Sequence, residues 1–275
     1  MLTDYHVHLR PDERESTAGK FFTRANAERY RESAAERGID ELGVAEHVYR
    51  FRQALEVWEH PFWRRYAVDD LDDYCGFVRE DTDLKLGIEA DFVPGREERM
   101  ANLLDAREWD YVIGSVHFVG DQSLDTEEFT VWTQTASAER IWRRYFETLA
   151  EAAQSGLFDI LAHPDLVKVW GKDRPIPDGD LRRFYYLAME VIADCDVAIE
   201  VSTAGFRKPV GEIYPAPAFL EMAIDAGKPL AMSSDAHTPD LLGYEYDRAA
   251  ELLDAMGVKE IAVFDGRVRR MEPLG

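Results

Sequence analysis

The stretch LTDYHVH, residues 2–8, is a short apolar run that ends in two histidines, and it opens a pattern that repeats along the chain. Apolar runs rich in β-branched residues are typical of buried strands. Further runs of this kind end at His47, His117, His163 and His237, and the run LKLGIEAD ends in Glu89 and Asp91. Six of the seven histidines therefore lie at the far ends of predicted strands, which points to one shared function.

These runs alternate with amphipathic segments along the whole sequence. The predicted strands span residues 2–8, 41–47, 84–93, 110–118, 158–166, 197–204 and 229–235, and a last strand-like run lies at 260–268. Between them lie segments with helical spacing, such as 23–38, where Ala27, Tyr30 and Ala34 share one face and Gly38 ends the helix. Another such segment begins at Ser137 and carries Ile141, Tyr145 and Leu149 on one face.

Seven or eight strands that alternate with helices favour parallel β-α units, so we expect the α/β class and a closed or nearly closed barrel. In such barrels the active site lies at the C-terminal ends of the strands, where these histidines fall. Two long connections, residues 48–70 and 119–136, are expected to be lids or small insertions.

Length and composition favour one globular unit. The 275 residues contain no Pro/Ser linker, so we expect a single domain over 1–275. Apolar residues make up 46% and charged residues 31%, which argues against disorder. No charged leader and no membrane-length apolar run is apparent, and Cys75 and Cys195 are far apart, so a reduced, cytoplasmic location is expected. The oligomeric state is left open.

The net charge of −22 argues against two kinds of partner. An acidic surface repels the phosphate backbone of nucleic acids and the headgroups of anionic lipids. We therefore expect no nucleic-acid partner and no membrane partner. An anionic small molecule would need local cations at its site.

The strand-end residues are suited to binding metal ions. In HVH the two imidazoles are at positions i and i+2, on the same side of a strand, and DAH places Asp235 and His237 in the same way. Neutral imidazole and carboxylate are ligands for zinc, iron and manganese, and residues from several strand ends can enclose more than one ion. If these histidines had no shared function, their position at a strand end would have to arise by chance in five separate elements. His60, outside these runs, is expected to be an ordinary core or surface histidine.

Taken in order, these motifs resemble a known superfamily. HVH (6–8), EH (46–47), GIEAD (87–91), GSVHF (114–118), AHPDL (162–166) and SSDAH (233–237) are similar to the motifs of the polymerase-and-histidinol-phosphatase (PHP) metallohydrolases. The segment STAGFRKPVGEIYP (202–215) resembles the one that marks histidinol-phosphate phosphatases. The resemblance implies the PHP fold, which is a distorted (β/α)7-type, TIM-like barrel. It also implies a metal-dependent phosphomonoesterase that acts on a small phosphorylated metabolite, L-histidinol phosphate, in histidine biosynthesis.

The resemblance also implies a ligand set for two to three divalent ions (Zn, Fe or Mn). The first ion would be held by His6, His8, Glu89 and Asp235, and the second by Glu89, His117 and His163. A third would lie at His47 and His237. The family's further ligand for that ion falls on Arg14, which cannot bind a cation, so Asp12 or Glu13 would have to replace it, with Asp12 favoured. Weaker binding of the third ion is expected.

Catalysis by such ions needs no protein nucleophile, because they activate water and neutralise the phosphate. Asp235 and His237 are the candidates for protonating the leaving alkoxide. Substrate contacts are expected from Lys168, Arg207 and Lys208 at the phosphate and from Tyr214, Glu212 and Asp91 at a cationic leaving group. The aromatic loop 57–66 and Tyr214 are candidates to cover an imidazole ring.

The sequence is compatible with three alternative functions. The first is a PHP phosphoesterase of other specificity, either a nuclease or phosphodiesterase or a generic phosphatase. The second is an amidohydrolase, but that family commonly bridges its ions with a modified lysine, and GSVH offers none. The third is a barrel that keeps metals for structure only.

Overall fold

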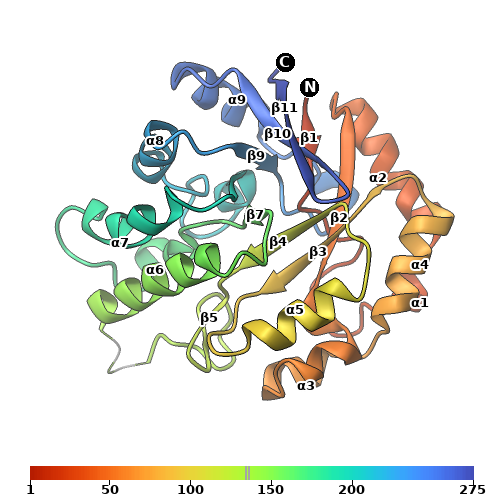
Figure 1. Ribbon diagram of the computed structural model, residues 1–275, viewed down its shortest axis with the longest axis horizontal. Helices are drawn as coiled ribbons and strands as arrows, with labels where there is room; N and C mark the ends of the chain where they lie inside the picture. The colour runs from red at the N-terminus through yellow and green to blue at the C-terminus, as the bar shows by residue number, and fades with distance from the viewer. Residues whose placement is uncertain (134, 136) are drawn as a thin grey trace.

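The computed structural model describes residues 1–133, 135 and 137–275. Its main sheet has seven parallel strands in the order β1-β2-β3-β4-β7-β8-β9 (Figure 1). They are β1 Thr3–Asp4, β2 Glu41–His47, β3 Lys85–Asp91, β4 Tyr111–Ser115, β7 Ile160–Leu161, β8 Ala198–Ser202 and β9 Leu230–Ser233. Beyond the first and last strands, Val7 and Ala236 form a parallel bridge, and the His8 amide donates to the Ala236 carbonyl at 2.8 Å. The sheet therefore nearly closes, which confirms the distorted (β/α)7 barrel.

Helices cover the outside of this barrel (Figure 1). They are α1 Ala18–Phe21, α2 Arg24–Glu36, α3 Pro61–Tyr66, α4 Leu71–Asp81, α5 Glu97–Asp105, α6 Ala138–Gln154, α7 Arg182–Ile192, α8 Pro217–Asp225 and α9 Tyr246–Ala255. The Thr23 side chain caps α2 by accepting from the Asn26 amide at 3.2 Å, and the helix ends shortly before Gly38, whose φ is +68°. The Ser137 hydroxyl caps α6 in the same way, from the Arg140 amide at 3.4 Å. The apolar faces predicted for both helices are buried.

The C-terminal segment differs from the other strands. The strand-like run at 260–268 is not an eighth barrel strand: β10 (Glu260–Asp265) pairs antiparallel with β11 (Val268–Pro273). Phe264 of β10 packs with Tyr5 and Tyr111 inside the barrel, at the end where the parallel strands begin. The N-terminal nitrogen donates to the Pro273 carbonyl at 2.6 Å, so the two chain ends lie side by side, as Figure 1 also shows.

The two long connections are ordered in different ways. Residues 48–70 form short 3₁₀ turns and α3, and Trp58, Phe62 and Trp63 are buried there. In the second connection, β5 (Phe118–Val119) pairs antiparallel with β6 (Gln122–Ser123). Positions 134 and 136 of this expected loop lie outside the described residues. Both connections follow strand ends, so they border the same end of the barrel.

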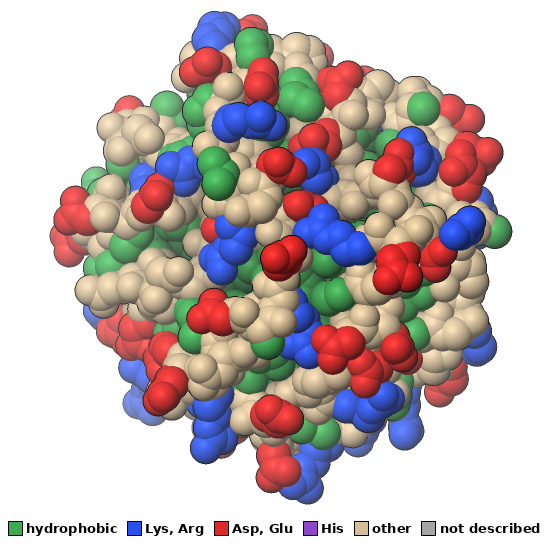
Figure 2. Space-filling view, turned by 45° about the vertical axis from the view of Figure 1, so that its right-hand side comes forward, with side chains coloured by type: hydrophobic (Ala, Val, Ile, Leu, Met, Phe, Trp, Pro, Cys, Tyr) green, Lys and Arg blue, Asp and Glu red, His purple; other side chains and the backbone are tan. Residues whose placement is uncertain are grey.

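The surface carries charges of both signs. On the face shown in Figure 2, lysine and arginine side chains lie among aspartates and glutamates and do not form a separate basic patch. Within the described ranges, no helix combines the length and the apolar character needed to cross a membrane.

Candidate metal centre

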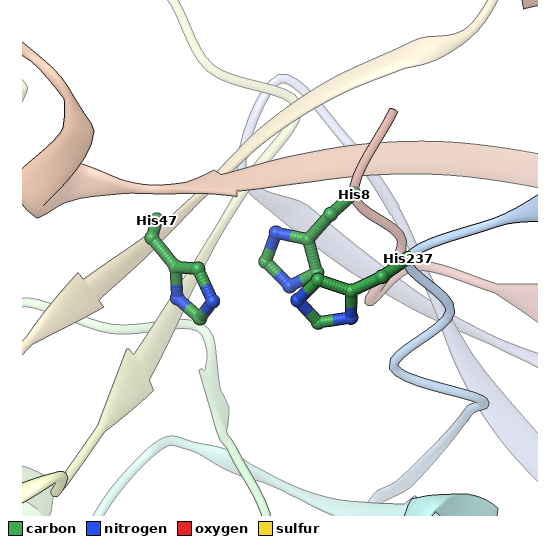
Figure 3. A group of neighbouring side chains, drawn as sticks. All are labelled: His8, His47 and His237. Carbon is green, nitrogen blue, oxygen red and sulfur yellow. The ribbon is translucent and has the colours of Figure 1, made fainter. Parts of the chain in front are cut away.

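The C-terminal ends of six strands bring the predicted ligands together. His47 is the last residue of β2 and lies directly beside Glu89 of β3 in the parallel register. Four groups of three side chains have potential ligand atoms within 4.8 Å of one another: His8, His47 and His237; His6, His8 and Asp235; His6, Glu89 and His163; His47, Glu89 and His117. Figure 3 shows the first group, in which the His8 ring stacks at 4.2 Å on each of the other two.

Glu89 occupies the middle of this cluster. Its Oε2 lies 3.2 Å from His6 Nε2 and 3.6 Å from His8 Nε2. Its Oε1 lies 3.3 Å from the Nε2 atoms of both His117 and His163. Oε2 also contacts His47 Nδ1. Since the two oxygens of one carboxylate face different sets of histidines, Glu89 could bridge two ions. Asp235 Oδ1 lies 3.4 Å from His8 Nε2 and completes the ligand set that was expected for the first ion.

Asp12 reaches the histidines predicted for the third ion. Its Oδ1 lies 3.4 Å from His47 Nε2 and 3.1 Å from His237 Nε2. Arg50 supports the segment that carries Asp12, because its guanidinium donates to the Pro11 carbonyl at 3.0 Å. The Glu13 carboxylate instead accepts from the Ser16 hydroxyl at 3.3 Å. The geometry therefore favours Asp12 over Glu13 at this position.

The charges in the cluster depend on one another. Burial by itself lowers the pKa of His47 and His117, but Glu89 and other carboxylates raise it, to about 9 for His47 and about 10 for His117. Burial would raise the pKa of Glu89, yet His47, His6 and His117 hold it well below its usual range. Buried carboxylates of this kind stay ionised only beside positive charge. Protons and divalent cations can both provide that charge, so they compete.

Several buried atoms of the cluster lie close to other polar atoms but form no hydrogen bond of acceptable geometry among the described residues. They include His6 Nε2, His8 Nε2, His47 Nδ1, Glu89 Oε2 and His237 Nε2. A buried polar atom without a partner costs about 1–3 kcal/mol, and so many at one place call for a ligand. Imidazole nitrogens and carboxylate oxygens suit zinc, iron or manganese. The residues therefore fit the expected ions.

Two carboxylates behind the cluster orient its rings. Glu200 in β8, which sequence reasoning missed, lies with Oε1 2.7 Å from His6 Nδ1, and its Oε2 accepts from the His163 amide at 2.5 Å. Asp91 lies with Oδ1 2.8 Å from His117 Nδ1. Such partners turn the opposite ring nitrogen toward the ions. The available signal for Glu200 was a single glutamate inside the apolar run VAIEVS. Asp91 is buried behind His117, so the expectation that it faces the substrate is not met.

The expected substrate contacts separate into two sets. Lys168 is buried, and its ammonium lies 2.8 Å from Asp165 Oδ2 and 2.7 Å from Glu212 Oε2. Lys168 and Glu212 thus bond to each other and are absent from the cavity wall. Arg207 is also absent from the cavity wall, but it donates through Nη2 to the carbonyl of Asp235, which does line the cavity, and its buried Nη1 has no partner among the described residues.

A cavity of about 290 Å³ opens over the cluster. Tyr214 and Lys208 line it, and the Tyr214 hydroxyl is buried without a partner in the described chain. The wall also carries five other aromatic side chains, Tyr49, Phe62, Tyr66, Phe118 and Trp170. The cavity therefore joins a polar floor of candidate ligands to an aromatic wall, an arrangement suited to a small polar molecule with a ring.

Comparisons with known proteins identify the family. A probable histidinol-phosphatase of Deinococcus radiodurans is 33% identical over 251 residues, which cover 89% of this chain and 91% of that protein. The histidinol-phosphatase of Bacillus subtilis is 24% identical over 81% of this chain and 91% of its own length. The crystal structure of histidinol phosphate phosphatase from Lactococcus lactis, complexed with zinc, L-histidinol and phosphate, has the same fold, with a TM-score of 0.70, 19% identity and 98% of each chain covered. The PHP domain profile matches residues 21–204, and the chain belongs to the PHP domain family.

Proposed function

We propose that this protein is a metal-dependent phosphomonoesterase that hydrolyses L-histidinol phosphate to L-histidinol and phosphate, a reaction of histidine biosynthesis. The observation that carries the reaction class is Glu89, whose two oxygens face separate histidine pairs within a buried cluster. The substrate rests on the relative that is 33% identical over most of the chain and is named as a probable histidinol-phosphatase. We treat residues 1–275 as one functional domain.

The proposed ligands follow the geometry of the cluster. One ion would be held by His6, His8, Glu89 and Asp235, a second by Glu89, His117 and His163, and a third by His47, His237 and Asp12. Zinc, iron and manganese all suit this set. Such ions, when bound, supply the Lewis-acid chemistry that activates water and neutralises the phosphate.

The protein's own side chains would bind the phosphate and move protons. Arg207 is not among the residues that line the cavity, but its buried Nη1 has no partner among the described residues and would donate to a phosphate oxygen, while its Nη2 donates to the Asp235 carbonyl. Lys208 in the cavity wall would add a second positive charge. Asp235 and His237, which are also proposed ligands, would pass a proton from a neighbouring water to the leaving oxygen, and the Tyr214 hydroxyl would hydrogen-bond to the substrate. Lys168 and Glu212 are not included, because their charges are paired with each other.

The test begins with protein purified without chelator. Elemental analysis should find two to three divalent ions per chain. Phosphate release should show a far higher kcat/KM for L-histidinol phosphate than for glycerol phosphate or a nucleoside monophosphate. Arg207→Ala should lower that kcat/KM by a factor that corresponds to roughly 1–3 kcal/mol of lost transition-state stabilisation, as expected for a lost charge-assisted hydrogen bond. Equal rates on all three esters would reduce the proposal to a generic PHP phosphatase, and no release from any of them would refute it.

A further inference from the structure

The cavity wall contains five carboxylates, and four of them already have a partner. Asp12, Glu89 and Asp235 face the histidines. Glu128 forms an ion pair with Arg65. The fifth is Asp125, which accepts from the Ser123 hydroxyl at 3.0 Å and has no lysine or arginine within salt-bridge distance in the described part of the chain. An ionised carboxylate can accept about four hydrogen bonds, so Asp125 has capacity left for a ligand.

Asp125 is also held in place before any ligand binds. The preceding residue, Leu124, is fully buried and donates its amide to the His117 carbonyl at 2.9 Å. The Leu124 carbonyl accepts from two indoles, Trp170 at 2.7 Å and Trp132 at 3.0 Å. A carboxylate on a segment tied this firmly loses little freedom when it binds, which favours recognition.

The lysine and arginine proposed for the phosphate belong to another strand end. Arg207 is bonded to the Asp235 carbonyl, beyond β9, and Lys208 follows it in the chain, whereas Asp125 belongs to the connection that follows β4. Trp170, which anchors the Asp125 segment, also lines the cavity, and so do Tyr66 and Phe62. Aromatic faces next to a carboxylate form a site for an organic cation, through cation–π attraction and an ion pair together. With divalent ions in the cluster, a phosphate bound there and a cationic group bound at Asp125 would each lie next to opposite charge.

We propose that Asp125 is the specificity-determining residue that binds the positively charged group of the leaving alcohol. This inference rests on the proposed function and deepens it: the preferred substrates are phosphomonoesters of alcohols that carry an ammonium or imidazolium group. It also replaces the earlier expectation that Glu212 and Asp91 take this role, since both are paired with groups of the protein itself.

The test compares Asp125→Asn with a matched control, Asp121→Asn. Asp121 is exposed, belongs to the same connection and is absent from the cavity wall. Binding of L-histidinol and of inorganic phosphate to the metal-loaded proteins is measured by calorimetry. Asp125→Asn should weaken L-histidinol binding roughly 10- to 100-fold, the range for a hydrogen bond to a charged group. Phosphate binding should stay within about threefold, and Asp121→Asn should change neither.

Turnover provides a second measurement on the same proteins. Asp125→Asn should lower kcat/KM for L-histidinol phosphate mainly through KM, while hydrolysis of the uncharged-alcohol ester 4-nitrophenyl phosphate is retained, which also shows that the variant is folded. Unchanged L-histidinol affinity in Asp125→Asn, or an equal loss for both ligands, would overturn the inference. A wild-type protein that binds L-histidinol through Asp125 but does not cleave its phosphate ester would refute the proposed function and leave the cation site standing.

Discussion

The two ends of the barrel are built by the same strands and have opposite character. Where the strands begin, the Tyr111 ring lies over Gly43 and Gly87, whose missing side chains make room for it, and its hydroxyl donates to the Tyr5 carbonyl at 2.6 Å. Where the strands end, histidines and carboxylates face one another, and several of their buried atoms have no partner among the described residues. Apolar packing at the first end stabilises the folded protein. The buried charges at the second end lower that stability until a bound cation compensates them.

Two residues at the polar end also have unusual backbone conformations. His163 and Asp235, both at the polar end, have φ values of +28° and +51°, in a region that side chains other than glycine rarely adopt. Such conformations cost of order 1–3 kcal/mol and cluster at functional sites. The strand beginnings therefore stabilise the folded protein, whereas the strand ends lower its stability in order to form a binding site.

Glu89→Ala should have the largest effect on activity. Removing the carboxylate that faces both histidine pairs should abolish phosphate release and lower the ion content below two per chain. Because the side chain contributes little to apolar packing, the circular dichroism spectrum should stay that of the folded protein. His60→Asn is the control, since His60 lies outside the cluster and its cap on the Phe62 amide is one that asparagine can also make. Full activity of Glu89→Ala would contradict the proposed bridge.

Tyr111→Ala should produce the opposite result at the other end of the barrel. The ring is fully buried between two glycines, so its loss should lower the free energy of unfolding by about 3–5 kcal/mol. Denaturant titration measures this change. The fraction that remains folded should keep its metal content and kcat. If metal content fell as far as in Glu89→Ala, the two ends would not be separable.

Glu200→Gln tests the support behind the cluster. Glutamine can still accept from the His163 amide but is no longer an anion beside His6 Nδ1. We expect metal affinity or kcat/KM to fall roughly 10- to 100-fold, the range for partners of this kind. Glu190→Gln on the outer helix α7 is the control. A Glu200→Gln protein with unchanged affinity for zinc would show that ring orientation does not depend on this charge.

Metal binding should weaken as the pH falls. The raised pKa of His47, about 9, and of His117, about 10, means that in metal-free protein both imidazoles hold protons at pH 7–8. An ion must displace those protons, so each released proton costs up to about tenfold in affinity per pH unit below these values. Calorimetry in buffers of different ionisation enthalpy should detect proton release at pH 8. Binding without proton release would show that the histidines are already neutral.

The smallest effect is expected at the third ion. Asp12 is exposed and replaces a ligand that the family ordinarily places at Arg14, so this ion should be the most easily lost on dialysis. Asp12→Asn should remove it and leave the other two in place, as measured by elemental analysis. Tight retention of three ions in Asp12→Asn would exclude Asp12 as a ligand.

Much of the site was predictable because strand ends are local features. A run such as DYVIGSVH identifies a strand and its last residues together, and parallel strands then bring those residues to one end of a barrel. Contacts between distant segments were not predictable in this way. Lys168 was expected to bind phosphate, but its ammonium pairs with Glu212, 44 residues away in the chain. No local pattern indicates such a partner.

The sequence by itself determined the seven parallel runs, the helices between them and the side chains that gather at the strand ends, whereas the structure showed that the run at 260–268 is not an eighth barrel strand. Spacing decides these features, because strand and helix periods place each residue on a definite side of its element. Only the tertiary structure decided which way the other charged side chains near the site point. Asp91 is turned behind His117, Asp125 lines the cavity, and Glu200 supports His6 from the neighbouring part of the barrel. These orientations depend on packing and hydrogen bonds between residues far apart in the chain, which exist only after the barrel has formed.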